Sequence, residues 1–563
     1  MANTREITYY DVSPYAALSA VGTVSGGEIQ DFSDVRKLFD EKTAYRSIQT
    51  CEHNYTILNG EYMELSENED IALWSKRQSA DGTHYLTQSI TLDISFGGLQ
   101  SSPGISFFFD VNGNNWCDML RIKWRRDGVI LSDKAFYPNS AVYSCVNKVD
   151  LYNGATIQFM RMNAPGRYFR LESVLFGIIR TFGDGELENL TVNEGRDPTG
   201  RTIYINSANF TINTKDELPY MFLKRQPLHI RHNGAYMGLY YIDKSKRYAD
   251  KRYSIEALDK IGVLDASDDF MGGMYDNISN IVTAENLIKQ IIPESFNFNV
   301  IIDGSLKNIK ITGWLPIMKR REALAQVAVA IGAVINTSRT NVIEVKPMPK
   351  SGGIKRVIDK DRVYQSAAVD IEFPYTGIEL IEHNFTAGGE ITELYGDVFS
   401  GEKTIKFSEP ASNLTIVNGT VLYFEANYAI IKSANENIKC VLTGRKYTYN
   451  QNAVTVKTAD MLEGTREKIE KIEDCYLVNR DNSQAVAQRL YSYYIRGNVF
   501  EGEFLIINAK IKSEMEQLGD TAEIATVFKD ANGKDEYISG QIEKLSLSLG
   551  NKNIKAKGVI RGD

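Results

Sequence analysis

The clearest periodic pattern in the chain lies between residues 314 and 345. Four apolar side chains recur there at helical spacing: Leu324, Val327, Ala328 and Ile331. Steps of three and four residues predict a helix over 319–332 with one buried stripe along a single face. Gly332 stands near the helix end, and the β-rich runs 333–336 and 341–345 enclose a polar stretch, which predicts a short hairpin. We interpret this helix and hairpin together as a packing unit, because they hold no evident catalytic group.

Residues 46–178 show the two-residue alternation that is typical of half-buried strands. The alternation is cleanest over 91–96, after which Gly97-Gly98 is expected to end the strand. Further strands are predicted at 105–109, 120–124, 155–160 and 168–176. A set of short strands joined by turns predicts an antiparallel β-sandwich.

A second β unit is predicted over 179–264. Its strands fall at 202–212 and 228–241, and a turn is expected at 197–200. The last segment, 253–261, fits either a strand or a helix, and the pattern leaves both open.

A small α+β unit is predicted over 265–348. Thr283 is a suitable N-cap for a helix over 284–292, which ends before Pro293, and the 319–332 helix follows. Strands return over 349–563 and are interrupted by one helix, 483–495.

The first 45 residues are mixed and polar, with a turn at Gly26-Gly27, and we interpret them as an adaptor arm. The predicted fold class is therefore mainly β with an α+β insert. It consists of a β-sandwich, further β domains of barrel type and a small helix–hairpin domain.

Composition narrows the class of protein. A chain of 563 residues is too long for one hydrophobic core, so three to five domains are expected. The net charge of −8 argues against a nucleic-acid partner, which would favour a basic surplus. The basic run Lys319-Arg320-Arg321 is expected to be a solvated face or a subunit contact.

Five cysteines occur without metal-binding spacing: Cys51, Cys117, Cys145, Cys440 and Cys475. We expect reduced, mostly buried thiols rather than a disulfide framework or a zinc site, consistent with assembly in a reducing cytoplasm. The first residues lack a secretory pattern, and no stretch has the length of a transmembrane helix, so no membrane insertion is expected.

No catalytic, cofactor or metal site is predicted. His229 and His232 are three residues apart in a strand-like stretch, so they point to opposite faces and share a metal poorly. Residues 110–115 resemble a calcium loop only superficially and are expected to form a polar turn. Acidic residues are plentiful, but no pair stands out for glycan cleavage.

The aromatic residues of the predicted sandwich are candidates for sugar contact. Trp124 shares a face with Leu120 and Ile122 and is expected in the core. Trp116, Trp74 and Tyr168 are the candidate glycan contacts, because an exposed ring can stack on a sugar. The competing interpretation is that these rings fill the core of the sandwich.

Several short motifs carry a resemblance to a known family. Their order along the chain is 181–187, 224–228, 253–262, 271–275, the 314–345 unit, 484–491 and 539–545. Over 180–563 the chain resembles the baseplate-hub and tail-tip structural proteins of Gram-positive phages or phage-derived particles. The preceding segment resembles a galactose-binding-like sandwich, although no specific motif marks it.

This resemblance implies a trimeric ring that joins a tail tube to the tip of the particle. The implied partners are two further copies of the chain, a tail-tube or distal tail protein, and a central spike or tip protein. The implied location is the tail tip or baseplate of a virion. The added sandwich leaves open whether the chain only builds the ring or also touches the host surface. Two alternatives are a receptor-binding protein that uses the sandwich to hold a host cell-wall glycan, and a tail-associated cell-wall hydrolase.

Overall fold

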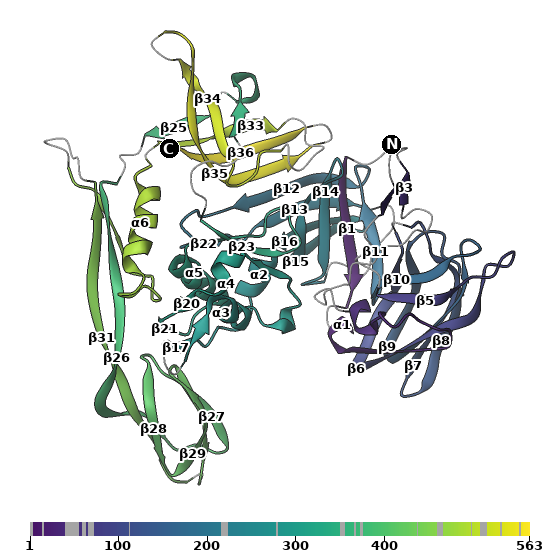
Figure 1. Cartoon of the computed structure of the whole chain (residues 1–563), viewed down its shortest axis with the longest axis horizontal. Helices are drawn as coiled ribbons and strands as arrows, with labels where there is room; N and C mark the ends of the chain where they lie inside the picture. The colour runs from purple at the N-terminus through teal and green to yellow at the C-terminus, as the bar shows by residue number, and fades with distance from the viewer. Residues whose placement is uncertain are drawn as a thin grey trace.

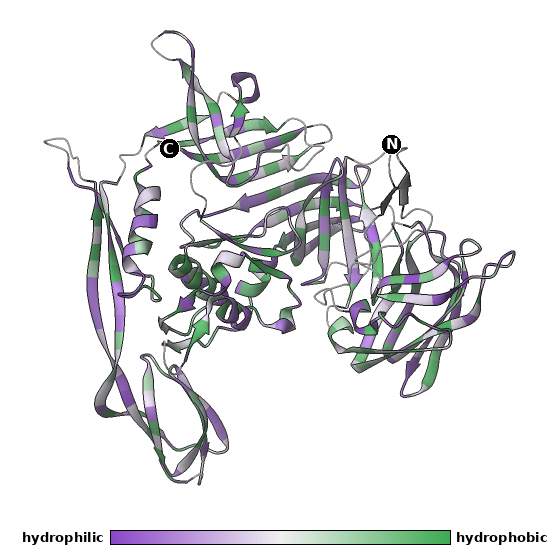
Figure 2. Ribbon diagram, viewed as in Figure 1, coloured by the Kyte–Doolittle hydropathy of each residue, from purple (hydrophilic) through white to green (hydrophobic). Residues whose placement is uncertain are grey.

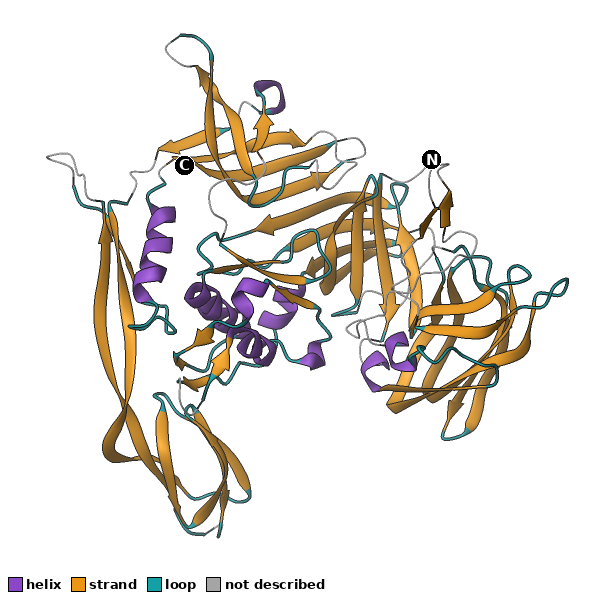
Figure 3. Cartoon of the chain, viewed as in Figure 1, coloured by secondary structure: helices purple, strands orange, loops and turns teal. Residues whose placement is uncertain are grey.

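The computed structural model confirms the mainly β class (Figure 3). Among the residues that the structure describes, strands make up 60% and helices 12%. These residues are 4–13, 16–39, 56–58, 63–65, 72–111, 113–214, 223–276, 280–348, 355–364, 367–371, 375–435, 437–458, 466–496, 498–506, 515–529, 532–550 and 553–562. Within these ranges the chain forms a large central sheet, a β-sandwich, a helical unit and an extended arm (Figure 1).

The central sheet has 13 strands in the order β11-β1-β14-β15-β16-β13-β12-β35-β36-β33-β25, with β34 paired to β35 and β24 to β34. In chain order its strands are β1 (Arg5–Val12), β11 (Gly177–Phe182), β12 (Leu187–Gly195), β13 (Ser207–Asn213), β14 (Pro227–His232), β15 (Ala235–Ala249), β16 (Arg252–Leu258), β24 (Lys355–Ile358), β25 (Ala368–Ile371), β33 (Asn498–Ile506), β34 (Thr521–Lys529), β35 (Asp535–Leu549) and β36 (Ile554–Gly562). The predicted second β unit and the end of the chain therefore share one sheet and one continuous core.

The N-terminal segment is not a separate arm over its described residues. β1 lies between β11 and β14, where Ile7 faces both Phe182 and Ile230 in antiparallel register. Ile7 and Tyr9 are fully buried, because their side of β1 faces the core of the central sheet. The strand was not predicted because the segment is mostly polar and few of its side chains are buried.

The sandwich is one seven-stranded sheet that folds over its own core. Its strands are β2 (Ala20–Ser25), β5 (Leu73–Gln78), β6 (Tyr85–Phe109), β7 (Cys117–Arg126), β8 (Val129–Phe136), β9 (Val142–Met162) and β10 (Tyr168–Leu175). A short pair, β3 (Thr56–Leu58) and β4 (Met63–Leu65), lies apart from it. Trp124 is fully buried in the core, as its shared face with Leu120 and Ile122 predicts.

The glycine pair Gly97-Gly98 does not end a strand, contrary to the prediction. β6 continues through it for 25 residues, and its pairing with β9 shifts register three times between Ser95 and Gly104. Such irregularities bend a strand without ending it. The bend allows β6 to pair with β2 on one side of the core and with β10 on the other.

Residues that precede the predicted sandwich also belong to it. The helix α1 (Ala16–Ser19), β2 and the 3-10 turn η1 (Val35–Leu38) all lie against this core, in which Ala16 and Leu38 are buried. Gly26 and Gly27 form the expected turn, since both have positive φ.

The helical unit contains α2 (Lys260–Asp265), α3 (Ala284–Ile291), α4 (Gly304–Lys307), α5 (Arg320–Ile331) and the turn η2 (Glu294–Phe296). Short strands surround the helices: β17 (Gly273–Tyr275), β18 (Val282–Thr283), β19 (Val300–Ile302), β20 (Lys310–Ile311), β21 (Gly313–Leu315), β22 (Ala333–Asn336) and β23 (Ile343–Pro347). Two predictions are confirmed here: the Thr283 hydroxyl accepts a hydrogen bond from the Asn286 amide at the start of α3, and β22 and β23 form the hairpin. The ambiguous segment 253–261 contains both a strand end and a helix start, with Asp259 as the N-cap of α2.

Helix α5 is buried on more than the one predicted stripe, and its green colour in Figure 2 continues along most of its length. Leu324 and Val327 pack into the helical unit, whereas Val329 packs into a second core beside α6 (Ser483–Tyr494). Because two cores meet at α5, the helix is apolar around most of its circumference. Its C-terminal end is capped by Gly332 at φ 71° and by Arg489, which donates to the Val329 carbonyl at 3.0 Å.

Two of the three residues in the basic run at the start of α5 have partners in neighbouring helices, whereas Lys319 is about half exposed and fits the expected solvated face. Arg320 donates to the Ile291 carbonyl at 2.7 Å, at the C-terminal end of α3. Arg321 pairs with Asp265 of α2 at 2.7 Å. Both arginines thus hold α5 against neighbouring helices.

An extended arm is the feature that the sequence did not predict. The long strands β26 (Gly377–Asp397) and β31 (Cys440–Lys457) form a hairpin that projects beyond the helical unit (Figure 1). Its tip carries β27 (Glu402–Lys406), β28 (Ala411–Val417), β29 (Gly419–Glu425) and β30 (Tyr428–Ser433), and its base pairs with β32 (Ile469–Ile472). The turn η3 (Lys360–Arg362) precedes it along the chain. The tip has a small core of its own, which includes Ile405 and Ile431.

A buried ion pair ties the helical unit to the central sheet. Arg339, in the β22–β23 turn, donates to both carboxylate oxygens of Glu194 on β12 at 3.0–3.2 Å. The two side chains are 1% and 0% exposed. A two-point guanidinium–carboxylate contact fixes orientation as well as distance.

We predict that Arg339→Ala destabilises the protein by about 3–5 kcal/mol, because it leaves the Glu194 carboxylate buried without its partner. Denaturant unfolding followed by fluorescence measures the change. Lys244→Ala, which breaks the exposed pair of Lys244 with Glu256 on the same sheet, is the matched control and leaves the midpoint unchanged. Equal midpoints for both variants would contradict the prediction.

Candidate interaction surfaces

A buried amide side chain anchors the arm to the helical unit. Asn427, between β29 and β30, donates to the carbonyls of Met271 and Leu315, both at 2.7 Å. Its oxygen accepts from the indole nitrogen of Trp314, also at 2.7 Å. Asn427 is 1% exposed, so these three bonds form away from solvent and set the direction of the arm tip.

A cluster of rings continues this anchor along the arm. Trp314 of β21 lies 5.2 Å from Phe385 and 5.8 Å from Tyr476, between ring centroids. Tyr449 stacks on Phe385 at 4.8 Å and on His383 at 5.8 Å. Because burial disfavours its charged form, the pKa of His383 is lowered from the ordinary value. The cluster therefore joins arm and helical unit through mostly neutral rings.

The tip of the arm exposes large apolar side chains. Leu422, Tyr423 and Phe424 are consecutive on β29 and are 46–49% exposed. Val417 on β28 and Ile391 on β26 are exposed on the same arm. An apolar group of this kind, far from the main cores, is typical of a surface that contacts another protein.

The sandwich exposes a second apolar segment at an open sheet edge. β8 is the last strand in its sheet, and Val129, Ile130 and Leu131 are 44–65% exposed. Soluble proteins usually cover or charge such edges to prevent unwanted strand pairing. β8 is therefore the second candidate contact surface.

The three predicted glycan contacts do not form one exposed platform. Trp74 is 5% exposed, lies 6.4 Å from the Tyr168 ring, and has the Arg170 guanidinium 3.8 Å from its ring centroid. Trp116 is partly buried and donates to the Pro138 carbonyl at 3.2 Å. Trp74 thus has little free ring face for a sugar, and contact through Trp116 or Tyr168 stays a prediction.

The 110–115 segment forms a turn, as predicted, over its described residues. The Asn115 amide donates to the Asp110 carbonyl at 3.0 Å, and the Gly113 amide donates to an Asp110 carboxylate oxygen at 2.7 Å. The other carboxylate oxygen of Asp110 accepts from Arg170 at 3.0 Å in a fully buried ion pair. The carboxylate is therefore occupied by the turn and by the arginine beside Trp74.

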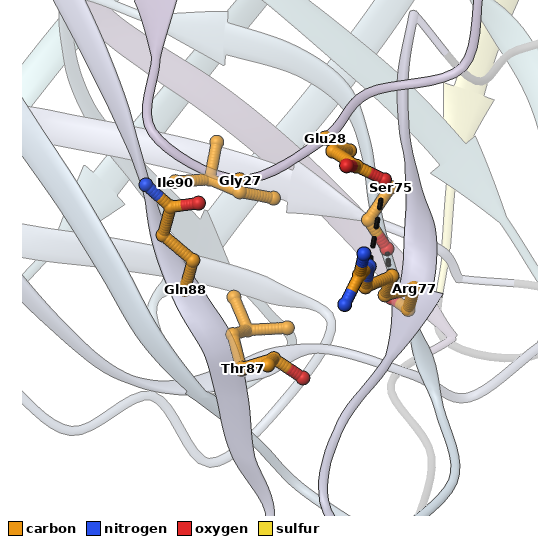
Figure 4. A pocket seen from close by; sticks show the side chains of 8 residues that line it. Gly27, Glu28, Ser75, Arg77, Thr87, Gln88 and Ile90 are labelled. Atoms are coloured by element: carbon orange, nitrogen blue, oxygen red, sulfur yellow. Dashed lines mark hydrogen bonds and ion pairs between the residues drawn. The ribbon is translucent and has the colours of Figure 1, made fainter.

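The sandwich also holds a cavity of about 140 Å³, shown in Figure 4. Its lining residues come from the Gly26-Gly27 turn, β5 and the start of β6: Gly27, Glu28, Ser75, Arg77, Leu86, Thr87, Gln88 and Ile90. Arg77 pairs with Glu28 at 3.4 Å, and the Ser75 hydroxyl donates to the Arg77 carbonyl at 2.8 Å. The sequence located the turn but not this cavity, because Ser75 and Gln88 become neighbours only through the fold.

His229 and His232 have different surroundings. His229 lies between the rings of Tyr10 and Tyr236, and one ring nitrogen contacts the Tyr236 hydroxyl at 2.8 Å. The other histidine, His232, is fully buried and contacts the Gly550 carbonyl at 2.9 Å. Within the described ranges, no group of three or more histidine, cysteine or acidic side chains is placed to hold a metal ion.

The described cysteines, Cys117, Cys145, Cys440 and Cys475, are all buried and unpaired, as predicted for these four. Burial raises the pKa of the Cys117 thiol to about 11 and that of Cys475 to about 12, so both stay protonated. Cys51 lies outside the described residues. In the same ranges, no helix has both the length and the apolar character needed to span a membrane.

Comparison with known proteins gives structural matches alone. No family model and no curated protein matches the chain. The 43 kDa tail protein of prophage MuSo2 from Shewanella oneidensis matches with 11% identity over 68% of this chain and 95% of that chain, at a TM-score of 0.39. A tail protein from Neisseria meningitidis MC58 matches with 10% identity over 68% of this chain and 94% of that chain, at a TM-score of 0.41.

A third match is the prophage tail protein gp18 from Listeria monocytogenes EGD-e. It has 12% identity over 67% of this chain and 91% of that chain, at a TM-score of 0.37. The chain is thus similar in structure to prophage tail proteins at low sequence identity. A likeness at this level describes the path of the chain and not what the protein binds.

We predict that Asn427→Ala loosens the arm without unfolding the sheet. The substitution removes three hydrogen bonds of a buried side chain and leaves the Met271 and Leu315 carbonyls without this donor. Local opening then becomes easier by about 1–3 kcal/mol, which raises the rate of hydrogen exchange around 425–428 and 313–316 by roughly 5- to 150-fold. Mass spectrometry of exchanged peptides measures this change.

Asn437→Ala, at an exposed position of the same arm, is the control for that experiment and leaves exchange unchanged. Unaltered exchange in Asn427→Ala would show that the amide does not hold the arm.

We also predict a pH dependence that originates at His229. Burial, and then the charges of Arg231 and Lys260, lower the pKa of His229 from 6.5 to about 4. The folded state therefore binds fewer protons than the unfolded chain between these values. The stability contributed by neutral His229 is intact above pH 6.5 and decreases as the pH falls toward 4.

At pH 5 this loss amounts to about 2 kcal/mol relative to pH 7. His229→Gln cannot titrate, so its unfolding free energy should fall by about 2 kcal/mol less than that of the unaltered protein over this interval. Denaturant unfolding at both pH values measures the difference, in which the contributions of all other groups cancel. Identical pH profiles would contradict the assignment.

Proposed function

We propose that the protein is a structural subunit of a phage tail tip or baseplate hub. In this proposal three copies form a ring that connects the tail tube to the tip of a phage or phage-derived particle of a Gram-positive host. The order of motifs over 180–563 supports this function, and the role is assembly rather than catalysis.

The observation that carries the proposal is the placement of exposed apolar segments relative to the cores. The sheet, sandwich, helical unit and arm tip have separate hydrophobic cores. The arm tip and strand β8 nevertheless expose Leu422–Phe424 and Val129–Leu131 to solvent. Apolar surface at two distant ends of one molecule is typical of a subunit that contacts several neighbours.

The partners proposed are two further copies, a tail-tube or distal tail protein, and a central spike or tip protein. The central sheet supports such a role mechanically, because strands from the first third and the last tenth of the chain share one hydrogen-bonded surface. The subunit would assemble in the host cytoplasm and remain in the particle, and its net charge of −8 favours protein over nucleic-acid partners.

The mass of the full-length protein in solution tests the ring. Light scattering should give about three times the 63.3 kDa of one chain, at micromolar concentration or after co-expression with the neighbouring tail proteins. In purified particles the protein should be present in three copies or a multiple of three, measured by quantitative mass spectrometry.

Phe424→Asp tests the arm tip as a contact surface, because a charge at an apolar interface carries a desolvation cost. The variant should fold normally but enter particles poorly, whereas Tyr137→Asp, which replaces an exposed aromatic residue of the sandwich, should enter them as the unaltered protein does. A protein that stays monomeric and is missing from purified particles would refute the proposed function.

A further inference from the structure

The cavity in the sandwich lies where two strands separate. β5 and β6 meet at the bridge between Ser79 and Leu86, and β10 pairs with both strands farther along. The segment after β2 crosses from β6 to β5, where Lys76 donates to the Glu28 carbonyl at 2.7 Å through its backbone amide. The crossing covers the gap between the strands and leaves the cavity beneath it.

Glycine is required at this crossing. Gly26 and Gly27 have φ of 67° and 52°, a region that other residues enter at a cost. A Cβ on Gly26 would lie 2.5 Å from the Ser89 carbonyl oxygen, and one on Gly27 would lie 2.6 Å from the Ile90 side chain. The backbone therefore approaches β6 closely and holds Glu28 at the rim of the cavity.

Polar groups face one another across the opening. Figure 4 shows Glu28 and Arg77 on one side and Thr87 and Gln88 on the other. Leu86 and Ile90, which are buried, supply the apolar part of the lining. In the part of the chain that the structure describes, the Gln88 amide and the Thr87 hydroxyl have no side-chain hydrogen-bond partner, so both can bind a ligand.

We propose that this cavity binds the terminal residue of a neutral saccharide. A sugar hydroxyl is both donor and acceptor, so it can donate to the Glu28 carboxylate while it accepts from the Arg77 guanidinium. The Gln88 side-chain amide can likewise donate to, and accept from, a neighbouring sugar hydroxyl. The C–H face of the sugar ring then lies against the small apolar part of the lining.

The charges of the cavity favour a neutral ligand over an ionic one. Glu28 and Arg77 already form an ion pair at 3.4 Å, so the rim presents no net charge for an ion to neutralise. The two side chains are 57% and 66% exposed, and ion pairs in solvent are weak, so a hydroxyl can replace part of the contact at little cost.

The volume limits the length of the ligand. At about 140 Å³ the cavity is smaller than the roughly 300–1,000 Å³ that enclose a drug-sized molecule, so it admits one ring at the end of a chain. A single ring makes few contacts, so a single hexose should bind with Kd on the order of 1 mM. Neither the hub proposal nor the three aromatic residues predicted for glycan contact is needed for this site.

Saturation-transfer NMR on the full-length protein tests the site with galactose, glucose, N-acetylglucosamine and rhamnose as probes. At least one sugar should show saturable binding. Arg77→Ala and Gln88→Ala should each weaken it about tenfold, since each removes hydrogen bonds to the ligand. Gln78→Ala on β5 and Arg121→Ala, which breaks the exposed pair with Asp133, are matched controls outside the cavity and leave binding unchanged.

Three results would overturn the proposal. The first is that none of the four sugars shows saturable binding in the millimolar range, and the second is binding that Arg77→Ala and Gln88→Ala leave unaltered. The third is that acetate or glycine binds at the cavity more tightly than any sugar, which would assign it to an ionic ligand. The circular dichroism spectrum of each variant should match that of the unaltered protein, which excludes unfolding as the cause of lost binding.

Discussion

The antiparallel pairing of β12 with β35 is the interaction on which the rest of the architecture depends. Val192 pairs with Leu547, and the Ser546 hydroxyl donates to Asn193 at 2.7 Å across a separation of 353 residues. This contact joins strands from two distant parts of the chain into one sheet over one core. The helical unit and the arm are encoded between these two strands, so the chain leaves the sheet to form each of them and then returns to it.

The helical unit and the arm are the two structures that this constraint produces. Glu194, one of the β12 residues paired with β35, accepts hydrogen bonds from Arg339 at both carboxylate oxygens and so fixes the β22–β23 hairpin against the sheet. The hairpin in turn positions α5, whose opposite sides belong to two different cores. The contacts of α5 and Asn427 orient the arm relative to the sheet, although most of the arm is exposed to solvent.

The sandwich is connected more simply, and this difference suits a separate task. β11, at the edge of the central sheet, contacts β6 and β9 of the sandwich, and β1 links the two units along the chain. The cavity beneath the glycine crossing lies within the sandwich and shares no residue with the sheet core. The proposed assembly surface on the arm and the proposed saccharide cavity on the sandwich could therefore act independently, because no buried group is common to both.

Local sequence determined the helices and the buried faces of several strands, whereas tertiary contacts decided where other strands form and how all the elements combine. Periodicity was sufficient for α5, for the N-cap at Thr283 and for the buried face of Trp124, since each depends on residues a few positions apart. Three features were not predicted: the strand β1, the continuation of β6 through Gly97-Gly98, and the arm. A strand is stabilised by pairing with other strands, and its own sequence does not show which strands those are. The candidate cavity depends on both local sequence and tertiary contacts. Its glycine turn could be read from the sequence, whereas the meeting of Glu28, Arg77 and Gln88 exists only because β5 and β6 separate in the folded sheet.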